Sequence, residues 1–295
     1  MFKGVGTAIV TPFNEDKTID YASFEKLIAR QVQAGVDFLV VLGTTGEAAT
    51  VSEDEKIALI EKAIASANKK IKIVAGIGSN NTKSVLEFMK KIDSMDIDGY
   101  LSVTPYYNKP TQEGLYLHFA EQAKVTKKEI ILYNVPGRTG CNLLPATVKR
   151  LAEDYKNITA VKEASGDLNQ VAEIIKNKGT GFTVLSGDDA LTLPMISLGG
   201  NGVISVVSNE VPSEFSDMVH YALDKDFVSA AKIHHKLLDL MNINFIESNP
   251  IPVKCALSLM GLIKEEYRLP LCPCKPESKD KIKKVLLDLS VEAKI

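Results

Sequence analysis

Short apolar segments alternate with longer amphipathic segments along most of the chain. The apolar segments are rich in Val and Ile, which is typical of strands buried on both faces of a parallel sheet. Eight such strands are predicted, at residues 7–10, 38–42, 71–75, 99–103, 130–133, 158–162, 183–186 and 203–206. Between them, apolar residues recur with helical spacing, as in 21–34, 53–68 and 82–95. Ser52 and Glu55 form a Ser-x-x-Glu pattern, which predicts that a helix begins there.

Eight strand–helix units, at roughly 25 residues each, predict an α/β fold of the (β/α)8 TIM-barrel type. A doubly wound sheet would also alternate, but it has roughly five or six strands and a Gly-x-Gly-x-x-Gly sequence that this chain lacks after its first strand. After residue 206 only helices are predicted, at 213–223, 227–242, 253–260 and 278–289. We therefore expect a catalytic barrel over residues 1–222 and a C-terminal helical appendage over residues 223–295.

Composition and charge narrow the classes of protein to which the chain can belong. Of 295 residues, 45% are hydrophobic, which excludes a disordered chain, and no apolar stretch approaches the roughly 20 residues of a membrane span. The 35 Lys and Arg residues are balanced by 37 Asp and Glu residues, so the basic excess that favours nucleic-acid binding is absent. The N-terminus lacks the pattern of a signal peptide. We expect a cytoplasmic protein that binds neither nucleic acid nor a membrane.

Metal and redox chemistry are not favoured by the residues present. Four Cys are too few for a disulfide framework, and Cys272 and Cys274 fit two reduced thiols better than a redox or metal site. Asp188 and Asp189 follow the seventh strand, but none of the four His falls at a predicted strand end. We predict no metal site, and we expect Asp188 to be the N-cap of the next helix.

In a barrel the active site lies where strands end, so the residues after each strand are the candidates. Thr44 and Thr45 lie between two glycines after the second strand, where hydroxyls and backbone N–H groups can bind a carboxylate or a phosphate. A Gly-rich turn whose threonines bond the local backbone would have the same sequence. Tyr106 and Tyr107 follow the fourth strand and suit a site, a subunit contact or both.

Two further candidates flank the end of the fifth strand. Tyr133 has a hydroxyl that can transfer protons, and the planar guanidinium of Arg138 suits a carboxylate. Arg138 could equally be the exposed residue of a capped turn. Ile204, on the eighth strand, is a candidate for the barrel mouth or for simple core packing.

Lys162 ends the apolar sixth strand, so its amine is expected at the barrel mouth with its aliphatic stem in the core. An unpaired buried amine is favoured in its neutral form, which is the form that adds to a carbonyl to make a Schiff base. The alternative is a structural ion pair with a neighbouring carboxylate. A buried amine, phenols, hydroxyls and an Arg together predict imine chemistry on a small keto acid.

Six segments resemble, in their order, the motifs of the dihydrodipicolinate synthase family, which belongs to the class I Schiff-base aldolases and lyases. They are GTTGE at 43–47, TPYYN at 104–108, YNVPGRTG at 133–140, VKEA at 161–164, LSGDD at 185–189 and NPIPVK at 249–254. The resemblance implies condensation of pyruvate with L-aspartate 4-semialdehyde to 4-hydroxy-tetrahydrodipicolinate, on the diaminopimelate route to lysine. It implies no cofactor, because pyruvate would be bound covalently to Lys162.

The resemblance also implies which residues are catalytic. Lys162 would form the Schiff base, and Tyr133 would donate and accept protons in a relay that Thr44 and Tyr107 complete. Family members are usually homotetramers made of two tight dimers. This implies that Tyr107 reaches the site of the neighbouring subunit.

The implied substrate-binding residues come from four different strand ends. Thr45 and Ile204 would contact pyruvate, with Thr45 on its carboxylate. Gly187 would line the substrate site, and Arg138 would hold the carboxylate of the semialdehyde.

Two alternatives remain open. Another Schiff-base lyase of the superfamily, such as N-acetylneuraminate lyase or a keto-deoxy sugar acid aldolase, would share Lys162 and Tyr133. Such enzymes generally lack the Arg at the position of Arg138, so this residue favours the synthase. A non-catalytic barrel that binds a keto acid would tolerate the loss of Lys162, Tyr133 or Thr44, all of which are present.

At some of the positions where lysine binds as an inhibitor in part of the family, this chain has different residues. Members that lysine inhibits strongly carry two His and a Glu in the segments that match Glu53, Lys56 and Ser84. Asn80 and Tyr106 do match. We expect weak or absent inhibition by lysine.

Overall fold

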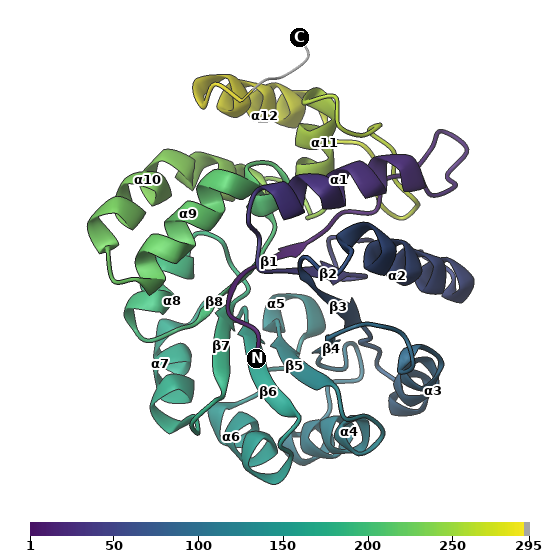
Figure 1. The fold of residues 1–295 in the computed structure, drawn as a ribbon, viewed down its shortest axis with the longest axis vertical. Coiled ribbons are helices and arrows are strands. Elements are labelled where there is room, and N and C mark those ends of the chain that lie inside the picture. Colours follow the sequence, from purple (N-terminus) through teal and green to yellow (C-terminus); the bar gives the residue numbers. More distant parts are fainter. Residues whose placement is uncertain (292–295) are drawn as a thin grey trace.

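The computed structural model describes residues 1–291 as a closed barrel of eight parallel strands (Figure 1). Each strand pairs with the next along the chain, and β8 pairs with β1 to close the ring. The strands are β1 Gly4–Ala8, β2 Phe38–Val41, β3 Lys72–Gly76, β4 Gly99–Val103, β5 Glu129–Asn134, β6 Ile158–Glu163, β7 Thr183–Ser186 and β8 Gly202–Ser205. The predicted (β/α)8 fold is confirmed.

The first strand begins earlier than predicted, at Gly4 instead of residue 7. Gly4 and Gly6 pair in register with Gly202 and Ile204 of β8, and this pairing makes the segment a strand despite its glycines. A Cβ on Gly6 would lie 2.1 Å from the Phe38 ring, so the neighbouring strand requires a glycine here. The hydrophobic pattern alone could not indicate this start, because glycine has no side chain to contribute to it.

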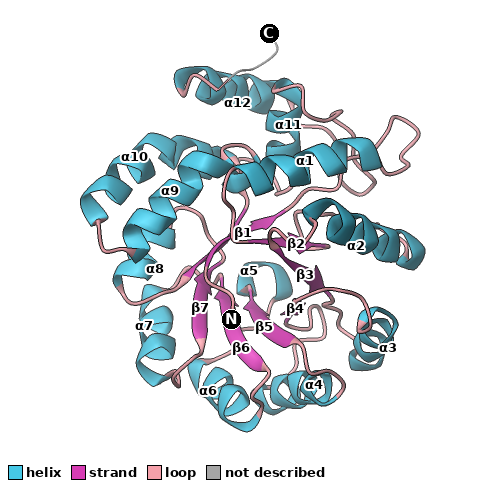
Figure 2. Cartoon of the chain, in the orientation of Figure 1, coloured by secondary structure: helices cyan, strands magenta, loops and turns pink. Residues whose placement is uncertain are grey.

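Helices surround the barrel as an outer layer (Figure 2). They are α1 Tyr21–Gln33, α2 Glu53–Ala67, α3 Thr82–Ile92, α4 Gln112–Lys124, α6 Pro145–Asp154, α7 Leu168–Asn177, α8 Thr192–Ser197 and α9 Pro212–Leu223. The short helix α5 (Pro136–Thr139) lies inside this ring, directly after β5. The predicted start of α2 is confirmed: Ser52 and Glu55 form a reciprocal capping box. The backbone N–H of Glu55 donates to the Ser52 hydroxyl, and the backbone N–H of Ser52 donates to the Glu55 carboxylate.

Three further helices, α10 (Phe227–Ile243), α11 (Ile251–Leu259) and α12 (Pro276–Asp288), lie at one side of the barrel, beyond α9 and α1 (Figure 1). Their buried apolar side chains form one cluster with Val5 of β1 and Val203 of β8. Helix α9 contacts both β1 and β8, and α10 packs on α9, so the C-terminal helices lie on the side of the barrel where the ring closes. A division into units at residues 1–222 and 223–295 stays a prediction.

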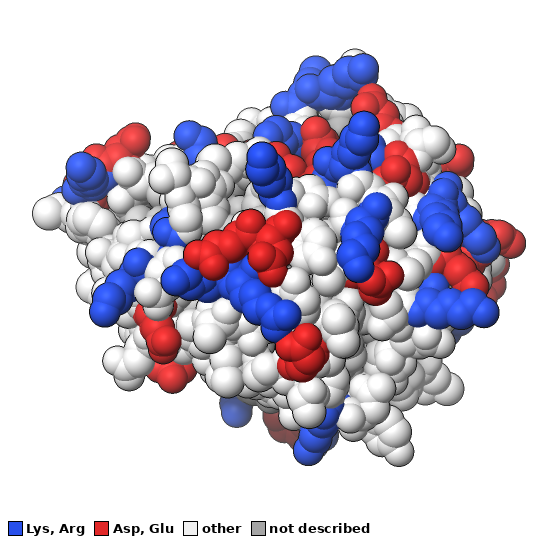
Figure 3. All heavy atoms as spheres, turned by 90° about the horizontal axis from the view of Figure 1, so that it is seen from below, with Lys and Arg blue, Asp and Glu red and all other residues white. Residues whose placement is uncertain are grey.

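Charged side chains of both signs are interspersed on the face of the molecule in Figure 3. This mixture fits the near balance of charge in the sequence. Among residues 1–291, no helix has the length and apolar character needed to cross a membrane.

Candidate active site

A cavity of about 570 Å³ opens at the carboxyl ends of β2 to β5. Three of the predicted site residues line it, namely Thr44, Tyr133 and Arg138. Each belongs to the segment that follows or ends a strand, as the barrel fold requires of an active site. Asn249, from the loop before α11, also lines the cavity.

Lys162 and Tyr133 lie side by side on neighbouring strands, in register with each other. Strand residues alternate between the barrel interior and the outer layer. Ala160 belongs to the interior cluster that also contains Tyr133, whereas Val161 packs under the helices. Lys162 therefore points inward, and its Nζ lies 4.4 Å from the centroid of the Tyr133 ring. Both residues are buried, with exposed fractions of 6% and 7%.

Lys162 differs from Lys254, the other buried lysine among residues 1–291. Lys254 forms an ion pair with Glu47. No carboxylate lies within 4.0 Å of the Lys162 amine in the described part of the chain. The adjacent Glu163 accepts hydrogen bonds from the side chains of Asn134 and Gln170 instead. The geometry thus disfavours the structural ion pair and leaves a buried amine free to react.

Two further predicted site residues are Gly187, directly after β7, and Ile204, on β8. Ile204 is buried in the interior cluster with Tyr133. Gly187 follows β7, and its N–H donates to the carbonyl of Glu163 at 2.8 Å. A Cβ on Gly187 would lie 3.0 Å from Cε of Lys162 and 2.5 Å from Cβ of Ala164. The glycine therefore leaves the space that the lysine stem occupies.

Replacing Gly187 with alanine is expected to lower kcat/KM by about 10- to 100-fold, because displacing a reacting group by about 1 Å costs this much. The added methyl group meets Ala164 close to its backbone, so the flexible Lys162 side chain must give way. Steady-state kinetics would measure the effect. Gly179→Ala is the matched control, since nothing lies within 4 Å of its added Cβ. Equal kinetics for the two variants would show that Lys162 does not depend on this space.

The two loop threonines face different surroundings. Thr45 is buried, and its Oγ1 accepts a hydrogen bond from Nδ2 of Asn249 at 3.1 Å. Thr44 is exposed at the cavity, and its carbonyl accepts from the N–H of Glu47 at 3.0 Å. Thr44 thus lines the cavity as an exposed residue, whereas the hydroxyl of the buried Thr45 is fixed by Asn249.

Arg138 lies on α5, where it is exposed and lines the cavity. Its Nη2 donates to the carbonyl of Asn249 at 3.2 Å. This single bond fixes one side of the guanidinium and leaves donors for an anion. Asn249 therefore holds Thr45 and Arg138 together. Asn249 belongs to the NPIPVK motif, but its position in the sequence predicts no function for it.

Tyr107 does not join the other predicted catalytic residues within one chain. Its side chain is 90% exposed and is not among the cavity-lining residues, whereas the neighbouring Tyr106 is. Its backbone has a φ of 75°, an uncommon conformation for an aromatic residue. The structure of this chain alone accordingly leaves the Tyr107 hydroxyl outside the relay.

Asp188 and Asp189, which follow β7, accept hydrogen bonds from backbone N–H groups. Oδ1 of Asp188 accepts from the N–H groups of Ala190 and Leu191, at 2.9 and 3.2 Å. The predicted N-cap was wrong: α8 begins at Thr192 after Leu191, and Asp188 instead caps the turn that precedes it. Oδ2 of Asp189 accepts from the N–H groups of Val206 and Val207, and burial raises the pKa of this carboxyl to about 6.

Groups of three or more His, Cys, Asp or Glu arranged as metal ligands are absent from residues 1–291. The four cysteines are free thiols, with Cys272 exposed and Cys274 buried. Neither observation bears on the site at the barrel mouth.

Comparison with known proteins identifies the fold family. The family model described as the Dihydrodipicolinate synthetase family matches residues 1–289. A 4-hydroxy-tetrahydrodipicolinate synthase from Methanocaldococcus jannaschii is 51% identical over 291 residues, which cover 99% of this chain and 100% of the relative.

Two solved structures have the same architecture. The dihydrodipicolinate synthase from Aquifex aeolicus is 42% identical, with a TM-score of 0.97 and full coverage of both chains. A dihydrodipicolinate synthase from Acinetobacter baumannii, in complex with pyruvate, is also 42% identical with a TM-score of 0.97, covering 99% of this chain and 100% of the other. The chain therefore belongs to the dihydrodipicolinate synthetase family, a family of lyases.

Proposed function

We propose that this chain condenses pyruvate with L-aspartate 4-semialdehyde to 4-hydroxy-tetrahydrodipicolinate, in the diaminopimelate pathway to lysine. Membership of the family supports the reaction. The observation that carries the mechanism is the buried Lys162 amine, which has no carboxylate partner in the described structure and lies against Tyr133. The reaction needs no external cofactor, and we place the enzyme in the cytoplasm.

Lys162 supplies the electron sink for the chemistry. The neutral amine adds to the carbonyl carbon of pyruvate, and loss of water gives an imine. The imine acidifies the pyruvate methyl group, which loses a proton to form an enamine. The enamine carbon attacks the aldehyde of the semialdehyde, forming the carbon–carbon bond. The semialdehyde amine then attacks the imine carbon, which closes the ring and releases Lys162.

Each proton movement needs a group beside the reacting atoms. Tyr133 lies against the Lys162 amine, so its phenol can carry protons to and from the intermediates. Thr44, which lines the same cavity as Tyr133, would continue this path toward solvent. Tyr107 of a neighbouring subunit would complete it.

Binding of the two acids is divided between the barrel floor and its rim. Thr45 would hold the pyruvate carboxylate, with Ile204 and Gly187 shaping the space around the reacting carbon. Arg138, at the rim, would bind the carboxylate of the semialdehyde by charge-assisted hydrogen bonds. A lyase for hydroxylated sugar acids would have no use for this cation, so Arg138 supports the synthase over that alternative.

The reaction is tested by borohydride treatment with pyruvate, followed by turnover assays. Intact mass should increase by one reduced pyruvate when borohydride is added with pyruvate and not without it. Turnover with L-aspartate 4-semialdehyde, and none with N-acetylneuraminate, would support the synthase. Absence of any adduct would refute imine chemistry, and an adduct with the opposite substrate preference would support the sugar-acid lyase.

The assembly we propose is a homotetramer of two tight dimers, in which Tyr107 is shared across each dimer. Tyr107 is 90% exposed and has a strained backbone conformation, and contacts within one chain do not account for this cost. A partner subunit would bury it and receive its hydroxyl.

Lysine below about 1 mM, which corresponds to roughly −4 kcal/mol of binding, is expected to leave turnover unchanged. Glu53, Lys56 and Ser84 line the same cavity as Thr44 and Tyr133. Glu53 already pairs with Lys91, Ser84 carries no charge, and Lys56 would repel a second ammonium. Assays of initial rate against lysine concentration would measure the response. Half-inhibition below this concentration would contradict the prediction.

A further inference from the structure

The segment after the second strand is tied to the C-terminal helical region by a buried ion pair. Glu47 ends the GTTGE segment, and Lys254 lies on α11, more than 200 residues later. Their carboxylate and ammonium groups contact each other, and both side chains are 0% exposed. The two charges of such a deeply buried pair depend on each other, because either charge alone would be strongly disfavoured there.

Two aromatic rings flank the lysine of this pair, and among the described residues no second carboxylate lies within 4.0 Å of its amine. Nζ of Lys254 lies 4.4 Å from the centroid of the Phe13 ring and 4.9 Å from that of Tyr267. The second carboxylate oxygen of Glu47 accepts from the backbone N–H of Arg268 at 3.4 Å. Both carboxylate oxygens of Glu47 thus contact groups of the C-terminal region, namely Lys254 and the backbone of Arg268.

Glu47 in turn determines the shape of the threonine loop. Its N–H donates to the carbonyl of Thr44, its carbonyl accepts from the N–H of Thr50, and its φ is 53°. This left-handed conformation costs energy for a non-glycine residue, so contacts around it must maintain it. The ion pair supplies such a contact, one residue after Gly46 and two after Thr45.

Asn249 makes the second attachment of the same loop. Its side chain donates to Thr45 Oγ1, and it lies five positions before Lys254 in the NPIPVK motif. One C-terminal segment therefore fixes the threonine loop at both the hydroxyl of Thr45 and the carboxylate of Glu47. If Lys254 only anchored α11 to the barrel, its ion-pair partner would not need to lie in the threonine loop.

We propose that Lys254 is a positioning residue, which holds Thr44 and Thr45 in the orientation that binds the pyruvate carboxylate, acting through Glu47. This inference rests on the proposed role of Thr45. It makes the C-terminal helical region part of the binding apparatus of the barrel, although Lys254 itself touches no substrate.

The test is a double-mutant cycle with K254M, E47Q and the double variant E47Q/K254M. K254M leaves an unpaired buried carboxylate and is expected to lower the thermal midpoint. The double variant removes both charges, so its midpoint should recover toward that of the wild type. Its kcat/KM for pyruvate should nevertheless stay about 10- to 100-fold low, because the loop is no longer held. The KM for the semialdehyde should change little, since Arg138 keeps its bond to Asn249.

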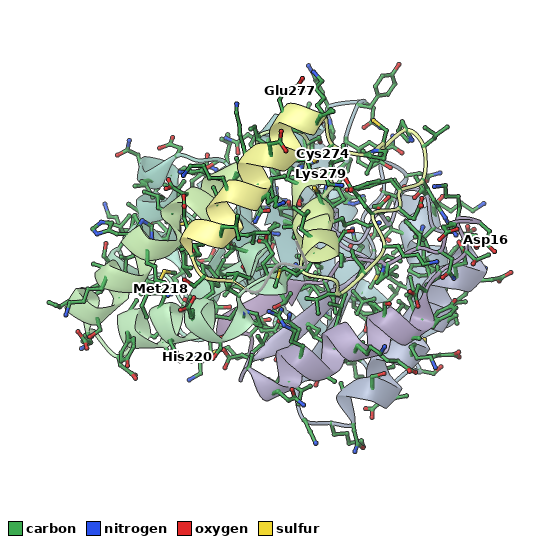
Figure 4. All side chains as sticks on the ribbon, turned by 90° about the horizontal axis from the view of Figure 1, so that it is seen from above. Asp16, Met218, His220, Cys274, Glu277 and Lys279 are labelled. Carbon is green, nitrogen blue, oxygen red and sulfur yellow. The ribbon has the colours of Figure 1, made fainter. Side chains whose placement is uncertain are left out.

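The matched control is K279M, which breaks the ion pair between Lys279 and Glu265. Lys279 lies on α12 beside Cys274 (Figure 4), and neither partner of this pair bonds to residues 43–47 in the described structure. This variant should keep the pyruvate kinetics of the wild type.

The outcomes separate this proposal from the proposed reaction. Recovery of both the midpoint and the pyruvate kinetics in the double variant would overturn the positioning role and leave a purely structural pair. Wild-type pyruvate kinetics in a folded K254M would overturn it as well. Failure of the wild-type protein to form a pyruvate adduct with borohydride would instead refute the imine mechanism, whatever the variants do.

Discussion

Replacing Lys162 with alanine is expected to reduce turnover at least about 1000-fold and to remove the pyruvate adduct that borohydride traps. Alanine retains the strand but cannot form an imine, and the described structure places no other lysine beside Tyr133. Without the imine, the pyruvate methyl group stays too weakly acidic to give an enamine. Intact-mass spectrometry would report the adduct, and a coupled assay would report turnover.

Lys178→Ala is a suitable control for this experiment. Lys178 is a half-buried lysine that donates to Asn201, at the opposite end of the strands from the cavity. It should keep both the adduct and turnover. An adduct of undiminished yield in Lys162→Ala would place the Schiff base on another lysine and overturn the assignment.

Replacing Tyr107 with phenylalanine is expected to lower kcat by about 10- to 1000-fold, the range for the loss of one proton-transfer partner. The substitution removes only the hydroxyl, so the Schiff base should still form and be trapped. The loss would show that the hydroxyl takes part in turnover, although Tyr107 is 90% exposed in its own chain. Wild-type turnover would remove Tyr107 from the relay.

Mixing subunits tests the sharing of Tyr107 directly. A dimer of one Tyr107→Phe chain and one Lys162→Ala chain contains a site with an intact lysine and the tyrosine of its partner. Co-expression should restore activity to a fraction of the sites. Tyr221→Phe, which removes the hydroxyl of an exposed tyrosine on α9, is the control and should have no effect. Absence of any restoration would mean that Tyr107 serves its own chain.

Periodicity predicted the barrel because strands buried on both faces have a strong local signal. The strands at 99–103 and 183–186 have the bounds that the sequence predicts. The start of β1 was missed because its glycines are selected by a pairing with β8 about 200 residues away. Asp188 was misplaced because a turn and a helix N-terminus use the same carboxylate bonds, and local sequence does not distinguish them.

The candidate site was predictable where a single residue carries the signal. A lysine that ends an apolar strand is conspicuous, and Lys162 does lie beside Tyr133. Asn249 could not be recognised in this way, because its role lies in joining Thr45 to Arg138 in space. Lys254 had one usable signal, a charge inside an apolar helical segment, but its partner Glu47 is distant in the sequence.

Closure of the barrel between β1 and β8 has a consequence for synthesis of the chain. β1 ends at Ala8 and its second partner begins at Gly202, so most of the polypeptide must emerge from the ribosome before the ring can close. The apolar cluster around Val5 of β1 also takes residues from α9 to α12, so it is complete only after these helices have followed. Until that moment the nascent protein exposes an unpaired strand edge, a state that is prone to misassembly. The N-terminal strand therefore reaches its final pairing only late in synthesis.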